Sequence, residues 1–318
     1  MTGFTVRTHG GGKMNYAVID VGGTFTKYAV MTAEGEFLRK GKIPTETEDL
    51  DLFLNSIAGI YQDAAAKEGD IAGAALSMPG FLDVETGYAY NGGGVYCVKE
   101  MNLIGALQER IPVPVTMEND ARCAALAELW HGNLAGCRDA AAVILGTGVG
   151  GGIIVNGEIL RGKHFVAGEL SYFMLEDMEG ELDEKKIAAR AASARGLVGM
   201  VAEAKGIPAD EIDGVRVFKM IEEGDESVRE ILWKFAGNVA RIICNIQIII
   251  DPERVVVGGG ISTQPLLIEM IREQARRIMK MFVWADLPVP EIEPCRFFND
   301  SNLIGALYSH KRQLGIKS

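Results

Sequence analysis

The chain has 318 residues, of which 48% are hydrophobic and 24% charged, and it carries a formal net charge of −11. This composition is that of a globular protein and excludes a disordered one, and the length suits two domains. The negative charge and the lack of a long Lys/Arg block argue against binding to nucleic acid or to a membrane surface. The apolar stretches are also shorter than the ~18 residues that a membrane span needs.

Residues 1–13 show no periodicity and lack the basic and apolar regions of a secretion signal. We therefore expect them to form a disordered tail, with Met14 as a candidate natural start. The five cysteines form no CxxC pair, which favours reduced thiols. These features predict a cytoplasmic protein.

The first ordered element is a β-hairpin that contains DVGGTFTK, residues 20–27. One β-prone run ends at Asp20, a Gly-Gly turn follows, and two further strands come next, separated by a turn at residues 34–35. Amides of such a turn and the hydroxyls of Thr24 or Thr26 are suited to phosphate, and Asp20 is suited to Mg²⁺ held through water. Taken alone, the pattern more often marks an ordinary hairpin turn.

The next elements alternate between helix and strand. We expect helices over residues 50–67, 102–110 and 122–130 and strands over 71–77 and 113–117. The segment MENDA, residues 117–121, lies where the last of these strands ends and a helix begins. Asn119 and Asp120 are favoured helix caps, and capping is the usual reason to find them there. A carboxylate at this place also suits the removal of a proton from a sugar hydroxyl, with Asn119 bonding neighbouring hydroxyls.

The hairpin pattern recurs in GTGVGGGIIVNG, residues 146–157. A β-prone run again ends in glycines, and Asn156-Gly157 predicts a second turn. The segment lacks the Lys of a Walker loop, and a strand follows it instead of the helix of a Rossmann turn. The recurrence indicates an internal duplication in which each copy opens one domain.

The remaining elements complete a second α/β half. We expect helices over residues 227–249, 264–281 and 301–313 and a buried strand over 254–257, with a mainly parallel sheet in each half. The strand runs into VVVGGGIS, residues 255–262. Ligands bind outside the carboxyl ends of strands in open sheets, so an adenosine would fit there, although a tight turn is the alternative. We expect an N-terminal domain of residues 14–119 and 300–318 and a C-terminal domain of residues 120–299.

The segments DVGGTFTK, MENDA, GTGVGGGIIVNG and VVVGGGIS, in this order, resemble the ROK family of bacterial sugar kinases and sugar-responsive repressors. The resemblance implies an α/β protein with the two-domain actin-like or hexokinase fold (ribonuclease H-like). Such a fold has duplicated βββαβα units and binds ATP and sugar in an interdomain cleft. Asp120 would be the catalytic base, and Asn91, Asn119 and Glu169 would bind the sugar. Our candidate nucleotide-binding residues are Asp20, Gly22, Gly23, Thr24, Thr26, Lys27, Gly146, Thr147, Gly148, Gly150, Gly258, Gly259 and Gly260.

The chain departs from the family after Ala-Gly-Glu. In many members Ile-Gly-His follows, and that histidine binds zinc together with a cysteine-rich segment. Here the sequence is AGELSYF, so Tyr172 replaces the histidine, no cysteine cluster follows, and we predict no zinc site. A rough alignment also puts Ala189 or a near neighbour where the family often has a second sugar-contacting glutamate. The loss of these partners should leave room for a substituent near C1 or C2 of the sugar. The alternative is that Tyr172 replaces the zinc as a structural prop.

The hypothesis is therefore a kinase that uses ATP and Mg²⁺ to phosphorylate the 6-hydroxyl of a hexose or hexose derivative. A β-glucoside is favoured, and N-acetylmannosamine and glucose are alternatives. The alternative from another class is a non-enzymatic sugar sensor; an actin-like ATPase is disfavoured by MENDA and Ala-Gly-Glu. No DNA-reading module is expected before the first hairpin, and by the resemblance a homodimer would suit the chain.

Overall fold

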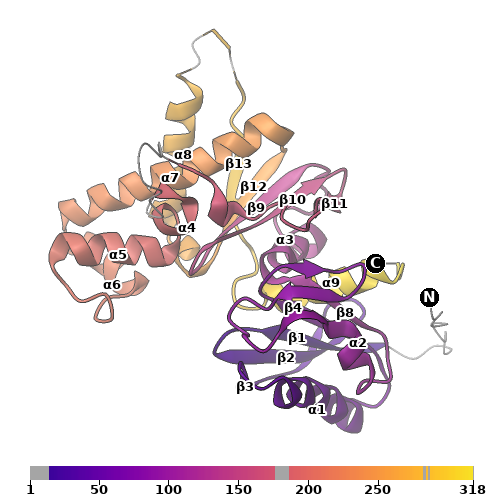
Figure 1. Cartoon of the computed structure of the whole chain (residues 1–318). Coiled ribbons are helices and arrows are strands. Elements are labelled where there is room, and N and C mark those ends of the chain that lie inside the picture. Colours follow the sequence, from indigo (N-terminus) through magenta and orange to yellow (C-terminus); the bar gives the residue numbers. More distant parts are fainter. Residues whose placement is uncertain (1–13, 176–185, 282–283, 286, 318) are drawn as a thin grey trace. The chain divides into compact units, whose positions relative to one another are not determined.

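The computed structural model describes residues 14–175, 186–281, 284–285 and 287–317, so the predicted tail at residues 1–13 lies outside the described residues. Two compact units are present (Figure 1). Unit 1 comprises the chain up to Trp130, the segment Lys163–Val166 and the chain from Asn299 onward. Unit 2 comprises His131–Gly162 and Ala167–Phe298. The helix after MENDA, which we expected to open the C-terminal domain, thus lies largely in unit 1.

Unit 1 is built on a five-stranded sheet in the order β3-β2-β1-β4-β8. Its strands are β1 (Asn15–Val21), β2 (Phe25–Thr32), β3 (Phe37–Pro44), β4 (Ile71–Met78) and β8 (Val115–Asn119). The first three strands form an antiparallel meander, and β4 and β8 run parallel to β1. Parallel neighbours bring the carboxyl ends of β1, β4 and β8 to the same edge of the sheet.

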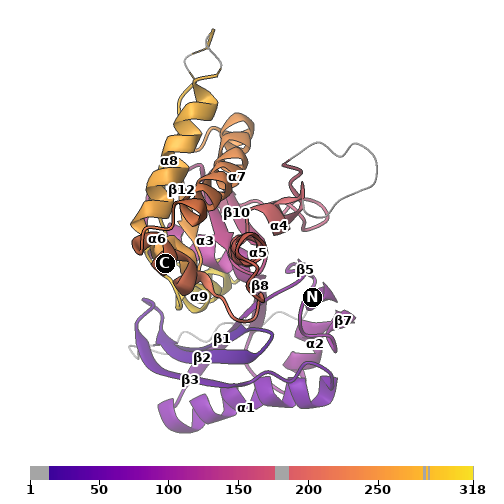
Figure 2. The same cartoon turned by 90° about the vertical axis from the view of Figure 1, so that its left-hand side faces the viewer.

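Two helices, α1 (Leu50–Glu68) and α9 (Ser301–Gln313), cover opposite faces of this sheet (Figure 2). Alternation along β1 explains why both faces are apolar, because Ala17 and Ile19 pack in the cluster with α1 while Tyr16 contacts His310 of α9. The Asp49 side chain caps α1 through the amide of Leu52. The other elements of the unit are α2 (Leu103–Gln108), α3 (Asp120–His131) and a small sheet of β5 (Leu82–Asp83), β6 (Tyr88–Asn91) and β7 (Lys99–Asn102).

Unit 2 has the same strand arrangement as unit 1, in a five-stranded sheet with the order β11-β10-β9-β12-β13. Its strands are β9 (Ala140–Leu145), β10 (Val149–Val155), β11 (Glu158–Ile159), β12 (Arg254–Gly258) and β13 (Glu291–Pro294). The meander is again antiparallel, and β12 and β13 again run parallel to β9. The matching strand orders confirm the duplication. The expected mainly parallel sheets are wrong in this respect, because each sheet is half antiparallel.

Helices of unit 2 bury the larger apolar cluster of the two units. They are α4 (Ala188–Ala191), α5 (Ala194–Lys205), α6 (Gly214–Glu222), α7 (Glu226–Ile250) and α8 (Pro265–Met279), with the short 3₁₀ helices η1 (Leu170–Tyr172) and η3 (Gly260–Thr263). The long helices α7 and α8 pack side by side (Figures 1 and 2). Within the part of the chain that the structure describes, no helix is both long and apolar enough to cross a bilayer.

Candidate active site

Asp20 lies near the carboxyl end of β1 and is almost buried, with 8% of its surface exposed. Two side chains donate to its Oδ1 atom: the hydroxyl of Ser77 on β4 at 2.9 Å and the amide of Asn302 on α9 at 3.0 Å. Burial raises the pKa of Asp20, while these two hydrogen bonds and the charge of Lys27 act in the opposite direction. The carboxylate on β1 is therefore oriented by two other elements of unit 1, β4 and α9.

The first glycine turn follows Asp20 directly and presents Gly23 and Thr24 to solvent. Gly22 donates its amide to the carbonyl of Phe25 at 3.1 Å, and a Cβ on Gly22 would lie 2.9 Å from that oxygen, so the tight turn requires glycine. Thr26 is different. Its side chain is 1% exposed and its hydroxyl bonds that of Thr45 at 2.9 Å. The Thr26 hydroxyl thus has a partner within unit 1, and the assignment of this residue to the nucleotide stays a prediction.

The junction of β8 and α3 places Asn119 and Asp120 as the sequence predicts. The Oδ1 atom of Asn119 accepts the amides of Ala121 at 3.0 Å and Arg122 at 3.2 Å, which makes it a helix cap. The Oδ1 atom of Asp120 also accepts the amide of Ala121, at 2.8 Å, and its side chain is partly exposed. Capping therefore falls chiefly to the nearly buried Asn119, while Asp120 is a partly exposed residue at the helix N-terminus.

Gly80, just beyond β4, brings the predicted sugar-binding residues of unit 1 together. The Asn119 side-chain amide donates to its carbonyl at 3.2 Å, and a Cβ on Gly80 would lie 2.1 Å from the carbonyl oxygen of Asn91. A Cβ on Gly94 would likewise lie 3.7 Å from Cα of Gly23 in the first turn. Asn91, Asn119, Asp120 and the first glycine turn therefore gather at the edge where β1, β4 and β8 end.

The second glycine turn, between β9 and β10, is exposed at Gly146 and Thr147. The amide of Gly146 donates to the carbonyl of Gly148 at 3.0 Å. Ser171 supports the turn: its Oγ accepts the amide of Val149 at 2.9 Å and donates to the carbonyl of the same residue at 3.1 Å. Gly150 lies further along, within β10 and opposite Ile144.

The third glycine segment continues β12. Gly258 is buried, and a Cβ on it would lie 2.7 Å from Cδ1 of Ile144. Gly259 has φ +97°, and a Cβ there would lie 2.0 Å from the carbonyl oxygen of Leu145. Close packing against β9 thus explains these two glycines, whereas Gly260 is exposed and has open space beside it.

Ala-Gly-Glu lies just before η1. Gly168 has φ +84°, and a Cβ on it would lie 3.3 Å from the carbonyl of Gly151 on β10. Glu169 is partly exposed at the start of η1, in the same unit as the second turn. Tyr172 is 63% exposed and so is not a buried prop. Many ROK members have their zinc-binding segment in the stretch that corresponds to residues 176–185, which lies outside the described residues. Within the described residues, no three His, Cys, Asp or Glu side chains cluster to bind a metal.

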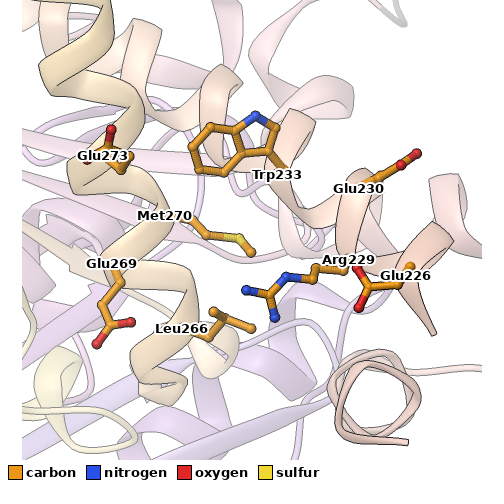
Figure 3. Close-up of a pocket in the computed structure, with 8 residues that line it drawn as sticks. All are labelled: Glu226, Arg229, Glu230, Trp233, Leu266, Glu269, Met270 and Glu273. Atoms are coloured by element: carbon orange, nitrogen blue, oxygen red, sulfur yellow. The ribbon is translucent and has the colours of Figure 1, made fainter. Parts of the chain in front are cut away.

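Sequence reasoning missed three polar supports of these turns: Ser77, Asn302 and Ser171. No local pattern marks them, because each acts on a residue that is distant along the chain. A pocket of about 390 Å³ lies elsewhere, between α7 and α8 of unit 2, and contains none of the predicted site residues (Figure 3). It is lined by Glu226, Arg229, Glu230, Trp233, Leu266, Glu269, Met270 and Glu273.

Known proteins resemble this chain over nearly its whole length. The model of the ROK family matches residues 16–313. A beta-glucoside kinase of Listeria monocytogenes is 30% identical over 93% of this chain and 97% of its own length. One of Klebsiella pneumoniae is 30% identical over 95% and 97%. The crystal structure of a ROK family protein from Streptococcus pneumoniae in complex with sucrose superimposes with a TM-score of 0.84 at 30% identity, covering 95% of this chain and 99% of that chain.

Proposed function

Because the chain belongs to the ROK family and is a sugar kinase, we propose that it transfers the γ-phosphate of ATP to the 6-hydroxyl of a hexose derivative. The observation that carries this proposal is the position of Asp120. Asp120 is partly exposed at the N-terminus of α3, next to Asn119, which bonds Gly80, and at the same sheet edge as the first glycine turn. A general base and a phosphate-binding turn are the parts that phosphoryl transfer to an alcohol needs.

Asp120 would accept the proton of the sugar hydroxyl as that oxygen attacks the γ-phosphorus and the bond to ADP breaks. The N-terminus of α3 favours the negative charge that a base must carry. The Ala121 amide fixes the Oδ1 atom, so the carboxylate is oriented before the sugar arrives. Asn91, Asn119 and Glu169 are the residues that we propose to bond other hydroxyls of the sugar.

The two exposed glycine turns would bind the phosphates of ATP through backbone amides, because negative charge is stabilised by such oriented dipoles. Gly23 and Thr24 are exposed in the first turn, as is Thr147 in the second, and Gly260 would lie against the adenosine. Asp20 suits a magnesium ion bound through water, since Ser77 and Asn302 fix its Oδ1 atom. The ion would neutralise charge on the phosphates.

A β-glucoside is the acceptor that we favour. Both curated relatives described above are beta-glucoside kinases. By the resemblance, Tyr172 stands where many ROK members have a histidine, and Ala189 or a near neighbour stands where they often have a glutamate. Tyr172 is largely exposed, and alanine offers no side-chain hydrogen bond. A pocket without those partners would tolerate a substituent at the anomeric position.

The test is coupled ADP release with Mg-ATP against glucose, N-acetylmannosamine, N-acetylglucosamine, fructose, cellobiose and an aryl β-glucoside. We expect turnover to be highest on the β-glucosides and to fall at least ~10²-fold in Asp120→Asn. Asp70→Asn, which changes an exposed carboxylate of the same unit, is the matched control and should retain full activity. Sugar binding by calorimetry without turnover on any sugar would refute the kinase proposal and favour the sensor.

A further inference from the structure

The residues on either side of Asp120 are tied to one another in a closed ring of contacts, all of them within unit 1. The carboxylate of Glu118 accepts the amide of Asn119 at 3.0 Å. The side chain of Asn119 in turn accepts the amides of Ala121 at 3.0 Å and Arg122 at 3.2 Å. The guanidinium of Arg122 then lies back towards Glu118, with its Nη1 atom 4.0 Å from Oε1. Asp120 therefore sits in a junction whose other residues hold each other in place.

Glu118 is wholly buried, although it carries a carboxylate, and helix α9 supports it from the other side. The Oε2 atom of Glu118 accepts the hydroxyl of Ser309 on α9 at 3.3 Å. The side-chain amide of Gln313, one turn further along α9, donates to Oγ of Ser309 and to the carbonyl of Met117 on β8, both at 3.0 Å. Helix α9 thus contacts both the backbone of β8 and the carboxylate near its end.

Stability alone does not account for the buried charges of Glu118 and Arg122. Their side chains are 0% and 1% exposed, so water relieves neither charge. Taking such a pair out of water costs much of what the attraction returns, and apolar residues of similar size are often as stable. Charged groups add strong, directed hydrogen bonds that apolar side chains lack. The pair is therefore better explained by the geometry that it imposes on the junction of β8 and α3.

We propose that Glu118 is a positioning residue for Asp120: its buried carboxylate, held by α9 and Arg122, fixes the junction of β8 and α3 and so the direction in which the Asp120 carboxylate meets the sugar hydroxyl. The inference rests on the proposed function for the role of Asp120 as the base. A base must lie within hydrogen-bond distance of the proton that it takes. A misplacement of about 1 Å is enough to slow a transfer ~10²-fold.

The first test is Glu118→Gln, which keeps the length of the side chain and removes its charge. Thr116→Val is the matched control, since Thr116 is also a buried residue of β8 that bonds α9, through Nδ1 of His310 at 2.8 Å, but it lies outside the ring. We expect kcat for the sugar to fall at least ~10-fold in Glu118→Gln, with KM for ATP within twofold of wild type. The control should keep kcat within twofold even where its unfolding midpoint is lower. Equal losses of kcat in the two variants would show a structural role only and overturn the proposal.

The double variant Glu118→Met/Arg122→Met separates positioning from stability. Methionine is unbranched and adapts to irregular gaps, and a buried charge pair can be replaced by apolar residues without loss of stability. The double variant should therefore unfold near the wild-type midpoint. Its kcat should still be at least ~10-fold lower, because the side chain that accepts the Asn119 amide is gone. A folded double variant with kcat within twofold of wild type would refute the positioning role.

A measurement without substrate separates this inference from the kinase proposal. Amide hydrogen exchange over residues 119–122 should quicken at least ~10-fold in Glu118→Met/Arg122→Met and stay unchanged in Thr116→Val. Unchanged exchange in both variants would overturn the role of Glu118 at the junction even if the wild-type enzyme phosphorylates sugars. Absence of sugar turnover in the wild type, with exchange quickened as expected, would refute the kinase proposal and leave the support of the junction by Glu118 standing.

Discussion

Acid should destabilise unit 1 through His310, whose imidazole is wholly buried between α9 and the sheet. Its Nδ1 atom lies 2.8 Å from the hydroxyl of Thr116 on β8, and its ring meets that of Tyr16 edge-on at 5.5 Å. Among the residues that the structure describes, the Nε2 atom finds no hydrogen-bond partner. A Cβ on Gly73 would lie 2.3 Å from Nε2, so only glycine leaves room for the ring. Burial lowers the pKa of His310 from 6.5 to about 4.

The sign of the pH dependence of stability follows from which state, folded or unfolded, binds the proton more readily. The unfolded chain takes up the proton near pH 6.5, whereas the folded protein resists it down to about pH 4. Stability is therefore fully present above pH 6.5 and is lost as the pH falls towards 4. One pKa unit corresponds to 1.36 kcal/mol, so the contribution of this residue amounts to about 3 kcal/mol.

The assay is urea unfolding between pH 8 and pH 4.5, followed by circular dichroism and tryptophan fluorescence, for wild type and His310→Asn. Asparagine can still bond Thr116 but does not titrate, so subtracting its pH profile removes the contribution of the carboxylates. We expect the stability advantage of wild type over the variant to shrink by about 2–3 kcal/mol across this range. A difference that stays constant within about 0.5 kcal/mol would refute the reasoning.

Three further predictions follow from the turns. Gly259→Ala should lower the free energy of unfolding by more than ~2 kcal/mol, because Gly259 has a positive φ and the new Cβ would lie 2.0 Å from a carbonyl oxygen. Gly260→Ala is the control: the space beside Gly260 is open, so the same urea titration should show a change of less than ~0.5 kcal/mol. Thr26→Val should cost about 1 kcal/mol in urea unfolding. An unchanged KM for ATP would remove Thr26 from the predicted nucleotide site, and a several-fold rise in KM would support its assignment there. Ser171→Ala should raise KM for ATP several-fold in steady-state kinetics, since it removes both bonds that support the second turn; an unchanged KM would show that the turn is rigid without it.

Periodicity predicted the long elements well, because each of them buries a regular apolar face. The helices expected at residues 50–67 and 301–313 are α1 and α9, and the duplication was visible in the two glycine hairpins. The small sheet of β5, β6 and β7 was not predicted, since strands of two to four residues carry too short a pattern. The prediction of parallel pairing was right for only half of the strand pairs in each large sheet, because the hairpins contribute as many antiparallel pairs as the crossovers contribute parallel ones.

The same limit applies to the candidate site: residues marked by a local sequence signal could be placed, and contacts between distant residues could not. Asn119 and Asp120 could be placed at the end of a strand because a local signal marks strand ends and helix caps. The inward direction of Thr26 depends on the register of β2, which the glycine turn does not reveal. The bond between Asn302 and Asp20 joins the two ends of the chain, and no sequence window contains both residues.

The discontinuity of unit 1 has a consequence for the order in which the chain acquires structure during synthesis. Helix α9 covers one face of β1, β4 and β8, yet it is made after nearly all of unit 2. Until the ribosome releases α9, that helix does not yet cover the sheet face that carries Tyr16. A partly synthesised chain therefore exposes this face to chaperones and to other nascent chains. The sequence of unit 2 ends at Phe298, so all of unit 2 is synthesised before α9. The half that is translated second is thus the first that can close its core.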